Sequence, residues 1–475
     1  MTADPRRWKS LAVLGIAYLM VVLDVAIVNV ALPSIQTDLD FAPENLQWVV
    51  SAYALTFGGF LLLGGRAGDL LGRRRIFMVG LLAFSAFSLL CGFSTSEEML
   101  IAARALQGAA GAILAPSVFS ITMVTFEEGA ERNKALGILG AIAGSGAAIG
   151  VLLGGILTEY AGWEWIFYIN APIGIATFFL VRRFVAESRV EGLARHFDAL
   201  GAVTVTASLM LLVYGLTQAN NAGWASAQTI GVLIASAVLM VATLFIEQRS
   251  PSPLVPLRFF RRVTPTGANI IGFGLGTIVF GMFFLLSLYM QQVLGFSAVK
   301  TGLGYLAVAL TAIVASGIAQ ALVTKIGVRP VLAAGMLLLA AGLVYFTFIS
   351  VDGTYLGDLL IGFLAIGVGL GFSFVPVSIA ALAGVPPVEA GLASGLINTS
   401  QQIGGALGVA IMTAVATSRT DSLVESGTDT PQALTDGFSA AFWVGVAFAV
   451  ASFIATFVLL RPRELEATPA GVHAA

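Results

Sequence analysis

The chain has 475 residues, of which 58% are hydrophobic and 11% charged, and its mean hydropathy is +0.94. Soluble globular proteins carry about 25% charged residues, so this composition excludes a soluble multidomain protein. The net charge of −2 says little about partners, and no basic tract suggests nucleic acid, so we expect no nucleic-acid partner.

Fourteen apolar blocks follow one another, each with the ~20 residues that a helix needs to cross a hydrocarbon core of about 30 Å. The first block is predicted to be a retained span, because it is too long for a signal peptide and no small-residue cleavage site precedes Asp24. The chain is therefore predicted to be an all-α integral membrane protein. Its spans are expected at 10–34, 46–70, 76–94, 98–124, 134–158, 165–184, 198–217, 228–247, 267–293, 299–323, 330–350, 356–382, 389–416 and 437–460.

The basic residues predict the orientation of these spans. All but three of the 24 Lys and Arg residues lie on the same side as the N-terminus. Lys300 and Arg419 lie on the opposite side, and Arg104 lies within the fourth span. Because basic loops stay in the cytoplasm, we expect both termini there, with the chain crossing the plasma (cytoplasmic) membrane.

The first span places Asp24 within the apolar run VVLDVAIVNVALP. Burying an unpaired charge is costly, so an acid at this position is a candidate functional residue. In the fourth span, LIAARALQGAAG places Arg104 and Gln107 on one helix face. At 1.5 Å of rise per residue, Asp24 lies about 14 Å and Arg104 roughly 9 Å below the outer end. The long arginine side chain lets the two charges meet, either as a working pair or as a static ion pair between helices.

The loop between spans two and three reads GGRAGDLLGRRR. Gly65, Gly68 and Gly72 permit a tight turn and close helix approach, and Asp69 can pair with arginines or with a helix N-terminus. A plain basic loop explains Arg73 and Arg74 but not the glycine spacing. A weaker copy, AQALVTKIGVRP, follows span ten, and internal repeats of this kind are typical of secondary transporters.

The GGRAGDLLGRRR loop resembles the signature of the major facilitator superfamily, and LIAARALQGAAG resembles its fourth-span motif. The run around Asp24 is similar to the first-span signature of the fourteen-span drug:proton antiporters of that superfamily. The resemblance continues in order through WEWIFYINAPIG, FDALG, PLVPLRFFRR, YMQQVLGFS and EAGLASGLINTSQQIGGALG. It implies a major facilitator fold with a six-helix bundle over 1–184, two inserted helices over 185–266, a second bundle over 267–463 and a short cytoplasmic tail over 464–475.

Three positions depart from that pattern: Ala26 replaces a threonine, Glu164 an arginine and Val151 the proline of the antiporter motif in GAAIGVLLGGIL. The missing proline removes a kink, which leaves uptake open beside export. The glycines of this fifth span still offer a small-residue face for the antiporter-like helix or for plain helix packing; they are Gly146, Gly150, Gly154 and Gly155.

Spans four, nine and thirteen contain the candidates for the substrate cavity. Adaptable, polarisable side chains suit apolar cations, and amides could line a cavity or bond a neighbouring helix. Packing against lipid or other helices is the alternative for each of them. The candidates are Gln107, Phe284, Tyr289, Gln292, Asn398 and Gln401.

The resemblance implies export of hydrophobic or cationic small molecules, such as drugs and dyes, in exchange for protons by alternating access. Asp24 would be the protonatable carboxylate facing the central cavity, and Arg104 would tune its proton affinity. We expect no enzyme, metal or cofactor, with the proton gradient as energy source and a monomer in the lipid bilayer as the working unit. Export of an endogenous metabolite or lipid, and a non-transporting sensor or scaffold, are the alternatives.

Overall fold

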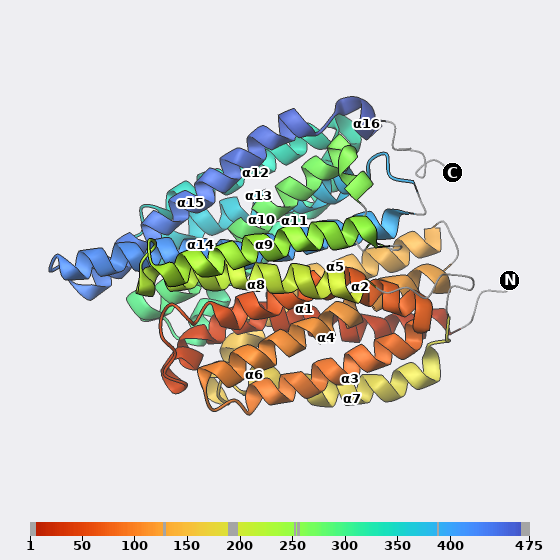
Figure 1. Cartoon of the computed structure of the whole chain (residues 1–475), viewed down its shortest axis with the longest axis horizontal. Coiled ribbons are helices and arrows are strands. Elements are labelled where there is room, and N and C mark those ends of the chain that lie inside the picture. The colour runs from red at the N-terminus through yellow and green to blue at the C-terminus, as the bar shows by residue number, and fades with distance from the viewer. Residues whose placement is uncertain are drawn as a thin grey trace.

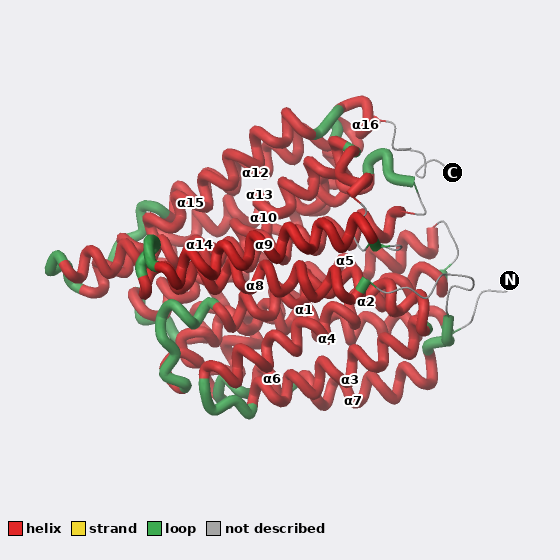
Figure 2. The backbone as a smooth tube through the Cα atoms, viewed as in Figure 1, coloured by secondary structure: helices red, strands yellow, loops and turns green. Residues whose placement is uncertain are grey.

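The computed structural model describes residues 6–126, 130–188, 198–250, 253, 257–386 and 389–466. Within these ranges all regular structure is helical, and most helices run along one common axis (Figures 1 and 2). Thirteen helices in the described part are long and apolar enough to cross a membrane, and the apolar part of the fifth helix, Ala148–Tyr160, adds another. The predicted all-α architecture with fourteen spans is confirmed.

The N-terminal helices pack mainly against one another. The strongest pairings join the second helix to the fourth, the first to the fifth and the third to the fourth. The short α6 and the following α7 together make the sixth span. The elements are α1 (Arg7–Asp38), α2 (Trp48–Leu71), α3 (Arg73–Gly92), α4 (Glu97–Thr125), α5 (Ala130–Tyr160), α6 (Trp165–Tyr168) and α7 (Asn170–Phe184).

Two further helices, α8 (Ala199–Ala222) and α9 (Ala227–Arg249), form a hairpin between the halves. Ser208 Oγ donates to Ser236 O at 2.9 Å and Ser236 Oγ donates to Ser208 O at 2.8 Å, which joins the two helices at mid-height. Helix α8 packs against both α2 and the C-terminal helix α14 (Ala390–Glu425). In Figure 1 the hairpin therefore runs across the front, between the N-terminal helices and the C-terminal helices.

The C-terminal helices form a second bundle in the same manner. The ninth span begins at Val263, earlier than the predicted position 267, and ends in a π-helical turn. Gly327, at φ +87°, separates two helices as Gly72, at φ +109°, does in the first half. The elements are η1 (Leu257–Arg261), α10 (Val263–Leu288), η2 (Tyr289–Val293), α11 (Ala298–Ile326), α12 (Val328–Phe346), η3 (Tyr355–Leu359), α13 (Leu360–Leu382), α14 (Ala390–Glu425), α15 (Thr430–Leu459) and α16 (Pro462–Glu466).

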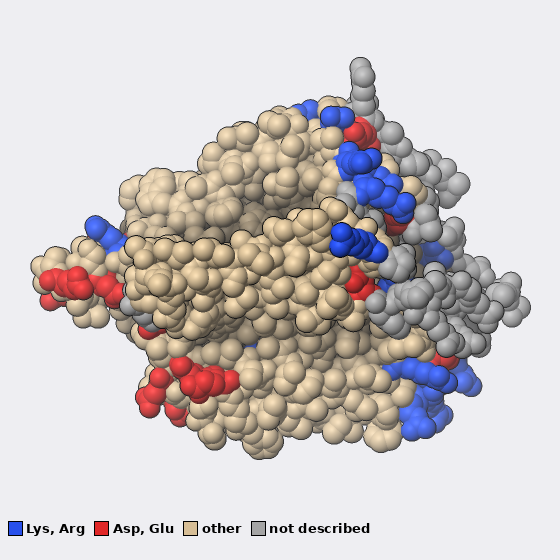
Figure 3. Space-filling model, in the orientation of Figure 1, with Lys and Arg blue, Asp and Glu red and all other residues tan. Residues whose placement is uncertain are grey.

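Charged side chains are segregated along the common axis. Lys and Arg gather at the end where α1 begins and α16 ends, whereas Asp and Glu gather at the opposite end (Figure 3). We call these the basic end and the acidic end. The middle of the visible surface is largely uncharged. Large apolar side chains are exposed there; on α9, for example, Val238 is 63% exposed and Phe245 54% exposed. A wide uncharged belt between two charged ends is the surface that a bilayer requires.

Two seams join the halves. Along α2 and α14, Thr399 Oγ1 donates to Gly58 O at 3.1 Å. Between α5 and α11, a Cβ atom at Gly155 would lie 2.6 Å from Ala298 O, so only glycine permits this approach. Nearby, Val299 N donates to Glu159 Oε2 at 3.0 Å. The α5–α11 contact thus brings the two halves together at the acidic end.

Candidate functional site

A buried charge cluster joins α1 to α4 in the N-terminal half. Arg104 Nη1 lies 2.6 Å from Asp24 Oδ2. Asp24 is 1% exposed and Arg104 2% exposed, so neither charge reaches water in this conformation. The structure thus brings together the two charges that helix rise places at overlapping depths. It encloses Asp24 in protein instead of opening it to a vestibule.

Two amides complete the shell of the Asp24 carboxylate. Gln107 Nε2 donates to Asp24 Oδ1 at 2.7 Å, and Asn170 Nδ2 donates to the same oxygen at 3.2 Å. Gln107 Oε1 also accepts from Arg104 Nη1 at 2.6 Å. The carboxylate therefore receives donors from α4 and α7. A buried ion pair is stable only when its remaining bonding capacity is satisfied in this way.

Arg104 makes two kinds of contact beyond the ion pair. Its Nε donates to Val49 O at 2.9 Å. The guanidinium lies 4.3 Å from the ring centroid of Tyr53 and 5.6 Å from that of Phe167. A planar guanidinium can bond in its plane and stack on aromatic faces at the same time, which a lysine ammonium could not reproduce.

Asn170 is a functional candidate that no sequence pattern singles out, although it lies in the WEWIFYINAPIG stretch. It is the first residue of α7 and is 2% exposed. Besides Asp24, it bonds Ser88 Oγ at 2.9 Å, and Ser88 in turn donates to Phe167 O at 2.9 Å. Four helices, α1, α3, α4 and α7, thus meet in one polar network.

The glycine-rich loop lies at the basic end, where it contacts a segment that follows α7, 113 residues further along the chain. Glu187 Oε1 accepts from Arg74 N at 3.1 Å, and Arg73 N donates to Ser188 O at 2.8 Å. A carboxylate from the segment after α7 therefore caps the N-terminus of α3, where negative charge is favoured. The predicted side-chain role of Asp69 lies outside the described residues.

The loop glycines differ in how strongly the structure requires them. Cβ atoms at Gly65 and Gly68 would meet Pro116 and Ser117 at ordinary distances of 3.5 and 3.6 Å. The close approach of α2 to α4 occurs instead at Gly64, where a Cβ would overlap Ala112 O. Gly72 needs its left-handed φ of +109°, which any other residue adopts with strain.

Comparison with known proteins places this geometry in a family. The chain matches the Major Facilitator Superfamily over residues 14–409. It belongs to that superfamily. It is 40% identical over 460 residues to the puromycin resistance protein pur8 of Streptomyces alboniger, covering 96% of this chain and 91% of the relative. It is 39% identical over 460 residues to the cephamycin export protein CmcT of Amycolatopsis lactamdurans, covering 96% and 93%.

Solved structures agree with this major facilitator fold. A bacterial homolog of the human lysosomal transporter Spinster, in an inward-facing and unoccupied conformation, superposes with a TM-score of 0.69 at 16% sequence identity. The match covers 97% of this chain and 98% of that structure. At this identity the likeness concerns the fold alone.

The predicted antiporter-like glycines lie at helix contacts. Cβ atoms at Gly146, Gly150 and Gly154 would approach α1 side chains within 2.8 to 3.0 Å. Gly150 lies against Ala26, so a retained glycine of the fifth-span motif meets the alanine that departs from the first-span signature. Val151, in place of proline, is 3% exposed, and its carbonyl lies against Gly302 of α11. Gly155 faces the opposite half, as described above.

The predicted cavity residues do not gather in one place. Gln107 belongs to the charge cluster. Phe284 and Tyr289 are fully buried in the C-terminal core, where Tyr289 Oη donates to Ser350 O at 2.6 Å. Both therefore pack within their own bundle in this conformation.

The remaining amide candidates also bond within the protein. Gln292 Nε2 donates to Gln36 Oε1 at 2.7 Å near the acidic end, across the two halves. Asn398 is exposed and donates to Ser394 O of its own helix at 2.8 Å. Gln401 lies against α10, where its carbonyl leaves room only for glycine at Gly276. Gln292 thus contributes to the contact between halves and Gln401 to helix packing.

Proposed function

We propose that this protein exports hydrophobic or cationic small molecules across the plasma membrane in exchange for protons, by alternating access. The superfamily membership and the export and resistance relatives support export. The single observation that supports proton coupling is the buried Asp24 carboxylate, held between Arg104, Gln107 and Asn170.

Protonation of Asp24 would change every bond in this cluster. A protonated carboxyl has no charge for Arg104 to neutralise, and one of its two oxygens becomes a donor. The donors from Arg104, Gln107 and Asn170 would then have to rearrange, because an unsatisfied buried polar group is costly. Since these donors come from α4 and α7, a proton on Asp24 would bias how those helices pack against α1.

The charge segregation supports an orientation with the basic end in the cytoplasm. In that orientation the close α5–α11 contact lies at the outer side. Its opening would expose the interior to the outside. We also propose a monomer as the transporting unit, because one chain supplies both halves that enclose the interior.

The proposal is tested by comparing Asp24→Asn with the parent protein in proteoliposomes that carry an imposed pH gradient and a panel of labelled compounds. We expect the variant to exchange a compound across the membrane but to lose its gradient-driven accumulation, because an amide cannot carry the proton. The measurement is the steady-state accumulation with and without the gradient.

Asp198→Asn is the matched control. Asp198 is also buried, but it caps α8 by accepting from Gly201 N at 3.0 Å, and asparagine is an equally good cap. This variant should accumulate compounds like the parent. Full gradient-driven accumulation in a folded Asp24→Asn variant would refute the role of Asp24, and gradient-insensitive transport of every compound would refute proton coupling itself.

A further inference from the structure

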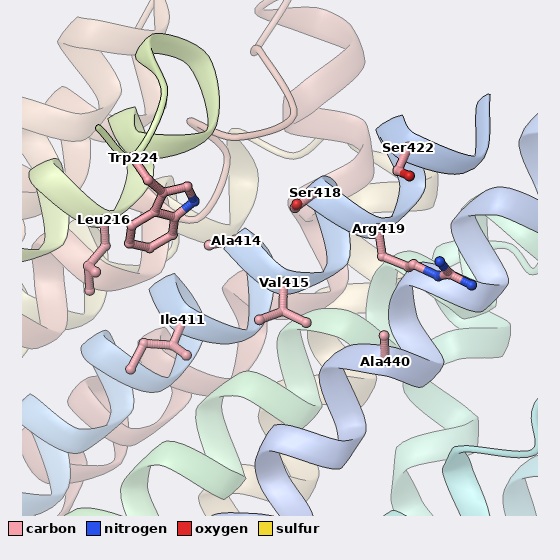
Figure 4. A pocket seen from close by; sticks show the side chains of 9 residues that line it. All are labelled: Leu216, Trp224, Ile411, Ala414, Val415, Ser418, Arg419, Ser422 and Ala440. Carbon is pink, nitrogen blue, oxygen red and sulfur yellow. The ribbon is translucent and has the colours of Figure 1, made fainter. Parts of the chain in front are cut away.

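A groove of about 470 Å³ opens at the acidic end, between the inserted hairpin and the C-terminal bundle. Figure 4 shows Trp224, from the turn between α8 and α9, on one side of α14 and Ala440 of α15 on the other. Along α14, the side chains that line the groove are apolar nearer the middle of the membrane and polar nearer the acidic end. Besides Trp224 and Ala440, its lining includes Leu216, Ile411, Val415, Ser418, Arg419 and Ser422.

The groove lies at the height of a membrane surface. Helix α14 begins at Ala390 at the basic end, so Arg419 lies about 44 Å along it, at 1.5 Å per residue. This distance matches the thickness of a bilayer with both headgroup layers, about 40–45 Å. Ile411 lies about 12 Å closer to the middle of the membrane than Arg419, by the same rise. This places it at the edge of the hydrocarbon core. Trp224 follows the end of α8, at the interfacial level that tryptophan prefers.

The polar side chains at the top of the groove are available to a ligand. In the described part of the chain Arg419 makes no ion pair, and the hydroxyls of Ser418 and Ser422 make no hydrogen bond. Ser418 and Ser422 are four residues apart and so share one face of α14. Asp421 lies two residues from Arg419 and therefore on another face of α14. The groove therefore presents an arginine that has no ion-pair partner among the described residues.

We propose that this groove binds one anionic glycerophospholipid of the outer leaflet. The phosphate would contact Arg419 and the two serine hydroxyls, since a guanidinium suits phosphate geometry. One acyl chain would lie along Leu216, Ile411 and Val415. The charge complementarity is specific, because Arg419 is one of only two basic residues expected at this end. The proposal rests on the proposed orientation and does not depend on proton coupling.

Such a lipid would connect the inserted hairpin of α8 and α9 to the C-terminal bundle. Leu216 and Trp224 belong to the inserted hairpin, whereas Ile411, Val415 and Ala440 belong to the C-terminal bundle. A bound lipid would fill the space between them and fix the hairpin against α14. The same groove without lipid would leave apolar side chains facing disordered acyl chains.

The test uses the full-length protein, purified from vesicles of phosphatidylglycerol and phosphatidylcholine in equal parts, with native mass spectrometry as the readout. The parent protein should retain one phosphatidylglycerol. Arg419→Gln should bind it about fivefold more weakly, the factor expected for one basic side chain at a membrane surface. Ala440→Phe, which fills the groove and keeps the charge, should also lose the lipid while its thermal unfolding temperature stays near that of the parent.

Lys300→Gln is the matched control, because it removes the other basic residue of the acidic end, whose ammonium lies 3.6 Å from the Phe296 ring centroid. It should retain lipid like the parent. Equal retention by the Arg419→Gln variant, or equal loss in Lys300→Gln, would overturn the proposal. So would equal binding of glycerol phosphate alone, or displacement of the lipid by a transported compound, because the groove would then serve a soluble anion or the export route. Asp24→Asn should leave lipid retention unchanged, which separates this result from the test of proton coupling.

Discussion

At the scale of single residues, hydrogen-bond donors from neighbouring helices compensate the charge of the carboxylate that is buried in the apolar helix α1. Asp24 receives Arg104, Gln107 and Asn170 from two other helices. Removing one partner of a buried ion pair costs about 3–5 kcal/mol, so the cluster contributes to the packing of α1, α4 and α7 whatever its role in transport. Depth along each helix predicts the Asp24–Arg104 pair. It does not predict Asn170, because only the packing of α7 brings that amide to α1.

We predict that Asn170→Ala lowers the free energy of unfolding by about 1–3 kcal/mol, since it leaves Asp24 and Ser88 each without one buried partner. The measurement is denaturant unfolding of the purified protein in detergent. Asn398→Ala is the control, because that exposed amide bonds only its own helix, and its effect should stay within about 0.5 kcal/mol. Equal effects of the two changes would show that the network adds no stability.

At the scale of helices, glycine decides where elements approach. The stripe Gly146, Gly150 and Gly154 brings α5 against α1, and Gly155 brings the same helix against α11 of the other half. A small-residue stripe is readable in the sequence as a packing face. The sequence does not say which helix it meets, because that depends on how the two bundles are placed.

We predict that Gly155→Leu slows transport and leaves the fold intact. A side chain there collides with the α11 backbone only when the acidic end is closed, and overpacking of about 1–3 kcal/mol would lower the population of that state about fivefold or more. The measurement is the initial rate of transport in proteoliposomes, beside the thermal unfolding temperature.

Gly231→Leu serves as the control for this change. Gly231 lies in α9 with open space where its Cβ would be, so a leucine there would face lipid. Its transport rate should equal that of the parent. A parent-like rate in Gly155→Leu would mean that the transport cycle does not pass through the closed contact.

At the scale of the whole molecule, charge and the inserted hairpin define the arrangement. Basic side chains cluster at the end where α1 begins, and acidic side chains cluster at the other (Figure 3). Helix α8 packs against α2 and α14 together, with Thr206 over Gly59 and Gln47 Nε2 donating to Thr217 Oγ1 at 2.7 Å. The hairpin thus covers the α2–α14 seam and leaves the α5–α11 seam without such a cover.

We predict that a cysteine at Ser426 reacts with a membrane-impermeant thiol reagent in intact cells, whereas a cysteine at Lys325 reacts only after permeabilisation. Both positions are exposed, at the acidic and the basic end respectively. The native Cys91 is 0% exposed, so it should give little background in either case. Labelling with the opposite pattern would invert the proposed orientation.

The sequence alone determined the membrane class, the fourteen spans and the family resemblance, because these follow from local composition, span length and contiguous motifs. It also predicted that Asp24 and Arg104 could meet, since helix rise converts residue number into depth. Only the tertiary structure decided which side chains surround them, that Phe284 and Tyr289 pack within their bundle, and that Glu187 caps α3. Those outcomes depend on the rotation and neighbours of each helix, which contacts between distant segments set and which no local pattern encodes.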